Sequence, residues 1–118
     1  MTTDKFTTAY IECALWSSTG DDGQPLDKTY GPDDITPETL ARMVSDCANF
    51  PSDNADALRE SGLSDSRAGH DFWLNRNGHG SGFWDEGQDP VFCKLSDASK
   101  VWGTFDLYVG DDGRIHGA

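Results

Sequence analysis

The sequence is poor in basic residues and contains no long apolar run. Nine Lys and Arg stand against 21 Asp and Glu, which gives a formal net charge of −12. Such a surface repels nucleic acid and anionic membranes, because binding to a phosphate backbone needs Lys and Arg to displace counterions. No apolar run approaches the roughly 20 residues of a membrane-spanning helix. We therefore expect no direct binding to nucleic acid or membrane, and a preference for basic partners. Acidity that serves only solubility is the alternative.

Cysteine is scarce and irregularly placed. Cys13, Cys47 and Cys93 are odd in number and show neither a CxxC pair nor the spacing of Cys and His that binds zinc. A disulfide framework is therefore not expected. Cys13 and Cys47 fall on the apolar faces of predicted helices, where a free thiol acts as a small hydrophobic group. A reducing compartment fits this pattern.

The chain of 118 residues predicts one domain, residues 1–118. Its 36% of hydrophobic residues is low, but large aromatic rings compensate because each buries much apolar area. A helical stripe of Phe6, Ala9, Tyr10, Cys13 and Ala14 predicts a first helix, with a strand as the alternative. Residues 17–34 carry turn residues without periodicity and predict a long acidic loop.

The second predicted helix has the clearest start signal. Thr36 suits the N-cap, Pro37 suits the first helical position, and Glu38 lies in the first turn. Apolar residues then recur at helical spacing until Pro51, where we expect the helix to end. Residues 54–61 predict either a short polar helix ending at Gly62 or a solvated loop.

The segment of residues 69–85, GHDFWLNRNGHGSGFWD, concentrates aromatic residues, glycines and polar side chains. Its apolar residues alternate from Asp71 onward, and Asn77-Gly78 is the strongest signal for a hairpin turn. We expect a β-hairpin in which Arg76 faces His79 at the tip. One face of it would add Phe72, Leu74 and Phe83 to the core.

The C-terminal part predicts a short helix from Ser96 to Trp102, terminated by Gly103. Residues 105–109 alternate as a half-buried strand, and Asp112-Gly113 is a second hairpin turn leading to a strand at residues 114–116. The order of elements predicts an α+β fold, with N-terminal helices packed on one face of a small antiparallel sheet of about four strands.

Candidate chemistry centres on the same hairpin. The metal candidates are His70, His79 and His116, with Asp71 and Asp85, but no HxH or HxxxH pair occurs, and the hairpin separates His70 from His79 by too many residues to share an ion. A hydrolytic site with His79 as base beside Asp71, Asn75 and Arg76 is a second possibility, yet no motif marks a nucleophile. We expect no catalytic residue, no metal site and no cofactor.

The acidic residues are the other candidate surface. A mimic of nucleic-acid phosphates must hold carboxylates on a rigid face, which only the helix from Pro37 and residues 53–60 would offer. The residues expected to contact a partner are Asp33, Asp34, Asp53, Asp56, Glu60, Asp71, Arg76 and His79.

Three stretches carry a resemblance to known proteins: AGHDFWLNRNGHGSGFWD at residues 68–85, YIECALWSSTGDDGQPLD upstream and FDLYVGDDGRIH downstream. Together they resemble a family of small acidic proteins encoded by bacteriophages and prophages. The resemblance implies a phage origin and a place in the cytoplasm of a bacterial host. It also implies inhibition of a bacterial defence system, of the anti-CRISPR or antirestriction type. It supplies no catalytic residue.

The sequence therefore predicts an inhibitor whose acidic surface occupies the basic nucleic-acid-binding groove of a CRISPR effector complex or a restriction enzyme. Two alternatives stay open. One is a small hydrolytic enzyme or ligand-binding module that uses the predicted hairpin at residues 70–85. The other is an accessory phage protein that binds a host factor through exposed Trp73 and Trp84.

Overall fold

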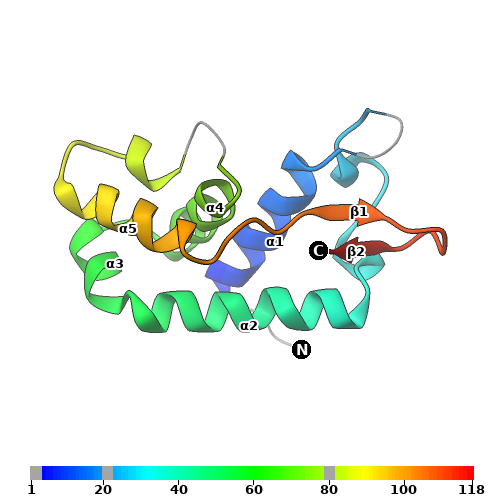
Figure 1. The fold of residues 1–118 in the computed structure, drawn as a ribbon, viewed down its shortest axis with the longest axis horizontal. Coiled ribbons are helices and arrows are strands. Elements are labelled where there is room, and N and C mark those ends of the chain that lie inside the picture. The colour runs from blue at the N-terminus through cyan, green and yellow to red at the C-terminus, as the bar shows by residue number, and fades with distance from the viewer. Residues whose placement is uncertain (1–3, 20–22, 79–81) are drawn as a thin grey trace.

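The chain folds into a mainly helical structure with one small antiparallel sheet (Figure 1). The structure is a computed structural model that describes residues 4–19, 23–78 and 82–118. Over these residues the α-helices and strands are α1 (Lys5–Ser17), α2 (Pro37–Asp53), α3 (Ala55–Ser61), α4 (Asp65–Arg76), α5 (Pro90–Lys100), β1 (Leu107–Val109) and β2 (Ile115–Gly117). Short 3-10 turns occur at η1 (Leu26–Lys28), η2 (Pro32–Asp34) and η3 (Phe83–Asp85).

Helix α2 runs along one long side of the molecule, with α3 and α5 at one end and the β1–β2 hairpin at the other (Figure 1). Helices α1 and α4 pack closely against each other. Gly69 permits this approach, since a Cβ at that position would lie 2.1 Å from the carbonyl oxygen of Phe6. The absence of a side chain at one position thus sets the distance between two helices.

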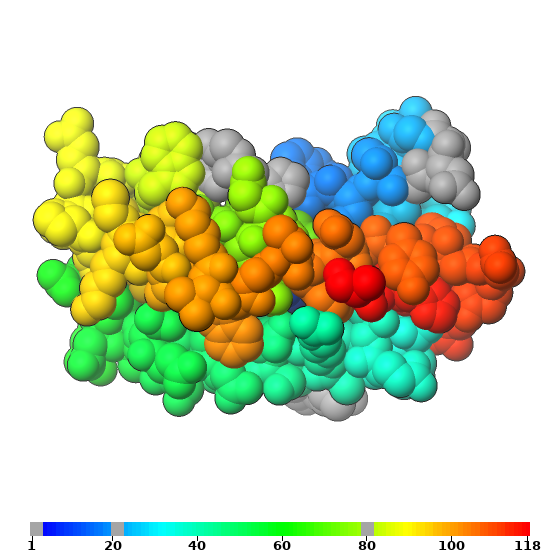
Figure 2. Space-filling model, in the orientation of Figure 1, coloured from blue at the N-terminus to red at the C-terminus, as the bar shows by residue number. Residues whose placement is uncertain are grey.

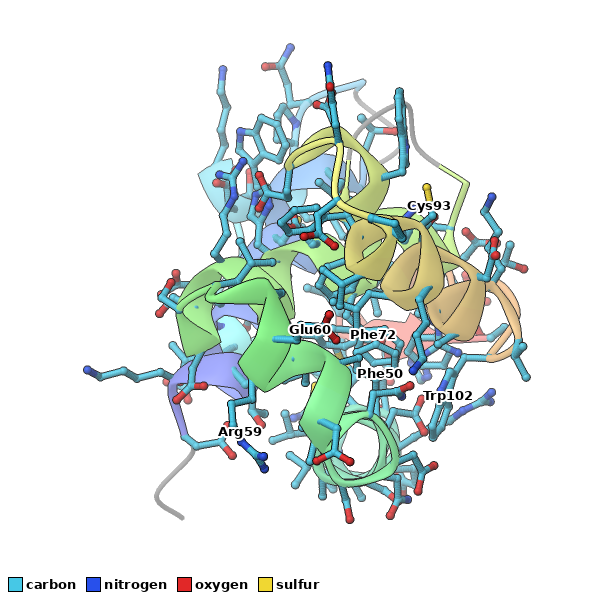
Figure 3. The ribbon with its side chains drawn as sticks, turned by 90° about the vertical axis from the view of Figure 1, so that its left-hand side faces the viewer. Phe50, Arg59, Glu60, Phe72, Cys93 and Trp102 are labelled. Carbon is cyan, nitrogen blue, oxygen red and sulfur yellow. The ribbon has the colours of Figure 1, made fainter. Side chains whose placement is uncertain are left out.

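Aromatic rings fill the core between α1, α2 and α4. The rings of Phe50 and Phe72 stack with centroids 4.1 Å apart and planes 11° apart, and they face each other between α2 and α4 in Figure 3. Tyr10 meets Phe72 and, edge-on, Trp73. Such ring pairs add to the stabilisation that burial of their area already provides.

Local capping residues begin the helices where the sequence offers them. The side chains of Asp4, Thr36 and Ser64 accept hydrogen bonds from backbone N–H groups in the first turns of α1, α2 and α4. The first helix is therefore confirmed, and the strand considered for it is wrong. The helix over residues 54–61 is also confirmed, with Gly62 at a φ of +72° as its end.

Pro51 does not end α2, which continues to Asp53. Proline removes one backbone hydrogen bond and its ring crowds the carbonyl four residues before it, but the residues after it can still donate to the helix. The carbonyl of Phe50 still accepts from the backbone N–H of Asn54 at 3.1 Å and from its side-chain amide at 2.9 Å. These bonds close the helix two residues beyond the proline.

The β-hairpin expected after Asp71 is wrong, because residues 65–76 form α4. The last residues of this helix are buried in an unbroken run (Phe72, Trp73, Leu74, Asn75 and Arg76), and a helix covered on all sides shows no apolar stripe. The Asn77-Gly78 pair ends this helix: Asn77 is the C-cap and Gly78 has a φ of +71°. The remainder of the expected turn, residues 79–81, lies outside the described residues.

The second hairpin is confirmed. Strands β1 and β2 pair antiparallel with Tyr108 opposite His116, and Gly113 adopts a φ of +74° in the turn. The α+β character holds, but the described residues form a sheet of two strands and not of about four.

Helix α5 begins earlier than expected, at Pro90, because Asp89 accepts from the N–H of Val91 and so caps it in place of Ser96.

Candidate functional site

Arg76, expected at a partner surface, lies in the interior instead, with 1% of its side chain exposed. Its guanidinium donates to Asp46 Oδ2 at 2.8 Å and to the Tyr10 hydroxyl at 3.0 Å. It also donates to the carbonyls of Gly103 at 2.9 Å and Trp102 at 3.2 Å. Because all these groups belong to the protein itself, Arg76 has a structural role and does not contact a partner.

Asn75 has a comparable structural role. Its amide donates to Ser96 Oγ at 3.0 Å, and its carbonyl oxygen accepts from the backbone N–H of Phe83. His79 lies outside the described residues. The hydrolytic or ligand-binding site expected around Asn75, Arg76 and His79 is therefore not assembled as a hairpin surface, since its first two members are buried.

The exposed aromatic surface differs from the one expected at Trp73 and Trp84. Trp73 is 2% exposed and donates through Nε1 to Ser17 Oγ at 2.7 Å, so it does not face a partner. Trp84 is 48% exposed, as that alternative requires. Trp16, near the end of α1, is also exposed, at 58%.

The predicted acidic residues lie at the two ends of α2. Asp33 and Asp34 belong to η2 before the helix, whereas Asp53 ends it and Asp56 and Glu60 follow in α3. The 17 residues of α2 separate these groups by about 25 Å. We call the exposed carboxylates along this side of the molecule the acidic edge; they are Asp33, Glu38, Asp53, Asp56 and Glu60. In Figure 2 this part of the chain, cyan to green, forms the lower border of the face shown.

A groove of about 790 Å³ lies between α1, the start of α4 and the η1–η2 segment. We call it the α1–α4 groove. Six of its residues carry side chains with distinctive chemistry: Glu12, Trp16, Asp27, Tyr30, Arg67 and His70. Its volume falls in the range of sites that bind small molecules or anchoring side chains. No single stretch of sequence predicts this groove, because α1, the η1–η2 segment and the start of α4 all contribute to it. One local signal was present, since Glu12 and Trp16 are four residues apart and thus share a helix face.

Among the described residues that line this groove, Arg67 alone carries a permanent positive charge, and this charge is engaged within the protein. Arg67 donates to both carboxylate oxygens of Glu86, at 2.6 and 2.9 Å. Such a bidentate pair is geometrically specific and stronger than a neutral hydrogen bond. Glu12 and Asp27 have no comparable partner among the residues that the structure describes. The groove is therefore acidic on balance.

Asp71 lies beneath this pair, with 2% of its side chain exposed. Burial, followed by the hydrogen bond and charge of Glu86, raises the pKa of Asp71 well above its usual range. If Asp71 were ionised, its Oδ2 would have no donor, whereas a protonated carboxyl can donate to Glu86. Asp71 is thus a neutral, buried support for the Arg67–Glu86 pair and is not the surface anion that the sequence predicted.

His70 faces the groove with 37% of its side chain exposed. Its ring lies 6.4 Å from that of Trp16, and its buried Nδ1 has no hydrogen-bond partner. Burial and the neighbouring Arg67 charge lower the pKa of His70. At neutral pH the imidazole is therefore uncharged and does not repel a cation.

The groove is also lined by a thiol and a hydroxyl, at Cys13 and Ser64, whose surroundings determine their reactivity. Cys13 lines the groove, but burial and the Asp71 carboxyl raise the pKa of its thiol to about 12, so it does not form a reactive thiolate. Ser64 caps α4 by accepting from the N–H of Arg67 at 3.1 Å. Across residues 4–19, 23–78 and 82–118, no cluster of three His, Cys, Asp or Glu side chains is placed to hold a metal ion.

None of the described helices combines the length and apolar character needed to cross a membrane. No protein-family model, no curated protein and no solved structure matches the chain.

Proposed function

We propose that the chain is a phage-encoded inhibitor of a bacterial defence system, and that it acts by binding a basic protein surface. The single observation that supports this is the number of exposed carboxylates without a basic neighbour. The described ion pairs with Arg occupy only Asp46, Asp56, Glu86 and, at 4.0 Å, Asp71. Most of the other acidic residues in the described part of the chain are exposed and form no ion pair with Arg or Lys, so their negative charge is available to a partner.

The proposed partner is a CRISPR effector complex or a restriction enzyme, whose groove for nucleic acid carries the complementary charge. Four of the five residues of the acidic edge lie on α2 and α3, and these helices hold their carboxylates in fixed positions. Complementary charge accelerates association and makes it sensitive to salt, because ions screen the attraction between exposed groups.

The experiment is capture of partners from a bacterial host that carries such a defence system, at low and at high salt. We expect a basic partner at low salt and less of it at high salt. Neutralising four residues of the acidic edge with Asp33→Asn, Asp53→Asn, Asp56→Asn and Glu60→Gln should weaken capture. A matched variant removes the same charge elsewhere, at the exposed residues Asp85, Asp97, Asp106 and Asp111, each changed to Asn. Recovery of no basic partner at either salt concentration would remove the proposal.

A second candidate is binding of a host factor through exposed aromatic residues, for which Trp16 and Trp84 supply the surface. The same capture experiment separates it from the first. Trp16→Ala or Trp84→Ala should abolish capture if an aromatic contact dominates, whereas neutralising the acidic edge should then leave capture intact.

A further inference from the structure

We propose that the α1–α4 groove binds an arginine side chain of the basic partner, stacked on Trp16 and paired with the carboxylates of Glu12 and Asp27. This inference rests on the proposed function, since it names the group by which a basic partner would be anchored. The group that binds in the groove would be a guanidinium at the end of an aliphatic side chain.

The aromatic part of the groove fits this occupant. Trp16 is the most exposed of the large aromatic side chains in the described residues, and it lines the groove with Tyr30. A guanidinium is attracted to an aromatic face, and among aromatic side chains Trp attracts it most strongly. Arginine stacks on such rings better than lysine because its charged group is planar.

The charged groups of the groove also favour an arginine side chain as its occupant. Arg67 is neutralised by Glu86, and His70 is uncharged at neutral pH. Glu12 and Asp27 are exposed at the rim and keep their charge available. Trp16 also lies in the last turn of α1, which contains no basic residue, so the negative end of the helix dipole adds to the attraction for a cation.

An anionic ligand fits poorly by the same argument. It would meet the carboxylates of Glu12 and Asp27, and the one guanidinium in the groove already makes two hydrogen bonds to Glu86. A purely apolar ligand would leave those carboxylates partly covered without a partner, which costs free energy. An arginine side chain can contact Trp16 and can also pair with the carboxylates of Glu12 and Asp27.

The test uses the whole protein and the blocked peptide Gly-Gly-Arg-Gly-Gly as the probe. The readout is the indole N–H resonance of Trp16, assigned by its loss in the Trp16→Phe variant. Two control peptides replace Arg by citrulline, which has nearly the same shape without the charge, and by Lys. We expect the Arg peptide to shift the Trp16 resonance and to bind more tightly than either control.

Variants test the carboxylates. Glu12→Gln with Asp27→Asn should weaken binding of the Arg peptide roughly 2- to 30-fold, the range expected when two exposed ion pairs are lost. The matched variant Asp97→Asn with Asp106→Asn removes the same charge at exposed positions outside both the groove and the acidic edge. It should change binding less than about twofold, because distant exposed charges are screened.

Three results would overturn the inference: equal binding of the citrulline peptide, equal binding of the Lys peptide, or equal weakening by both double variants. The partner itself gives a separate outcome. If the wild type and Trp16→Ala capture the same basic partner equally well, the groove is not its anchor while the proposed function stands. If the Arg peptide binds as expected but no basic partner is captured, the groove assignment stands and the proposed function fails.

Discussion

Arg76 joins four segments of the chain at one guanidinium group. It contacts α1 through Tyr10, α2 through Asp46, and the segment after α5 through two carbonyls. It also lies 5.5 Å above the ring of Phe72. A buried charge is tolerated only when it is paired and hydrogen-bonded, so the stability of this part of the core depends on all these contacts at once.

Replacement of Arg76 by Met should lower the free energy of unfolding by about 3–5 kcal/mol, because Asp46 and the acceptors around it lose their donor. Urea denaturation followed by circular dichroism measures the change. Arg59→Ala removes an ion pair whose side chains are 77% and 95% exposed, and it serves as the control with a change below about 1 kcal/mol. A loss for Arg76→Met as small as that of the control would contradict the structural role given to Arg76.

The protonation of Asp71 should make the free energy of unfolding depend on pH. Its raised pKa means that the folded protein holds a proton which the unfolded chain releases above about pH 4. The stabilisation from this group is therefore complete below the ordinary Asp pKa and is lost as the pH rises through the raised pKa of the folded state. Asp71→Asn keeps a neutral donor, so its stability relative to the wild type should increase by about 1–3 kcal/mol between about pH 4.5 and about pH 8.

Urea titrations of both proteins at the two pH values measure this difference. The pKa of Glu86 is lowered, so its own contribution is lost only below this pH range. Asp97→Asn, at an exposed position of α5, is the control and should show no comparable pH dependence. A constant difference between Asp71→Asn and the wild type would show that Asp71 is ionised in the folded protein.

Among the helices and strands, the sequence predicts the ones that have capping or turn residues at their ends. Helix α2 follows from Thr36 and Pro37, and the β1–β2 turn follows from Asp112-Gly113. Helix α4 could not be found in this way, because tertiary packing covers it on several sides and removes the periodic signal. Gly78 suits a positive φ both in a hairpin turn and just after a helix, where it has a φ of +71° while Asn77 has a φ of −96°, so the pair alone did not distinguish the two.

The candidate site was harder to predict than the fold. The sequence correctly indicated exposed carboxylates at Asp33, Asp53, Asp56 and Glu60, since short acidic runs at turns are usually solvated. The α1–α4 groove depends on how η1, η2 and α4 are placed beside α1, which no local pattern encodes. Sequence position alone likewise could not show that Asp71 is enclosed.

Helix packing at Gly69 gives a direct test of the α1–α4 contact. Gly69→Ala should destabilise the protein by about 1–3 kcal/mol, although alanine favours helices, because the new Cβ clashes with the backbone of Phe6. Ser66→Ala, at an exposed position of the same helix, should change stability little. Thermal unfolding of the two variants side by side measures this, and a stabilised Gly69→Ala protein would mean that the helices are further apart.

Thr39 links α2 to β2. Its hydroxyl accepts from the N–H of Gly117 at 3.0 Å and from the Thr36 hydroxyl at 2.8 Å. Thr39→Val keeps the shape but leaves both donors unpaired, so we expect a loss of about 1–3 kcal/mol in the free energy of unfolding. Thr39→Ser retains the hydroxyl and should lose less. Equal losses in chemical denaturation would show that the hydroxyl contributes nothing.

At the scale of the whole molecule, a charge of −12 is confined to a body measuring 43 × 29 × 21 Å. Like charges at these distances repel one another and oppose the compact state. Ions screen the repulsion, since the Debye length falls to about 8 Å at physiological ionic strength. Solution conditions should therefore affect folding and partner binding in opposite ways: salt favours the fold and disfavours a charge-driven complex.

The free energy of unfolding should accordingly rise as sodium chloride is added at neutral pH. The variant with the acidic edge neutralised at Asp33, Asp53, Asp56 and Glu60 should show a smaller rise. Chemical denaturation with urea, which is itself uncharged, measures both slopes. Identical slopes in the two proteins would mean that the acidic edge is not a source of the repulsion.

The three thiols differ in a way that has a practical use. Cys93 is exposed on the outer side of α5 (Figure 3), whereas Cys13 and Cys47 are enclosed in the core. A maleimide dye added to the native protein will therefore attach at one position per chain, which provides a homogeneous fluorescent reporter without mutagenesis. Later modification of the other two thiols would then count opening events, so that a single reagent reports both attachment and the rate at which the interior becomes accessible.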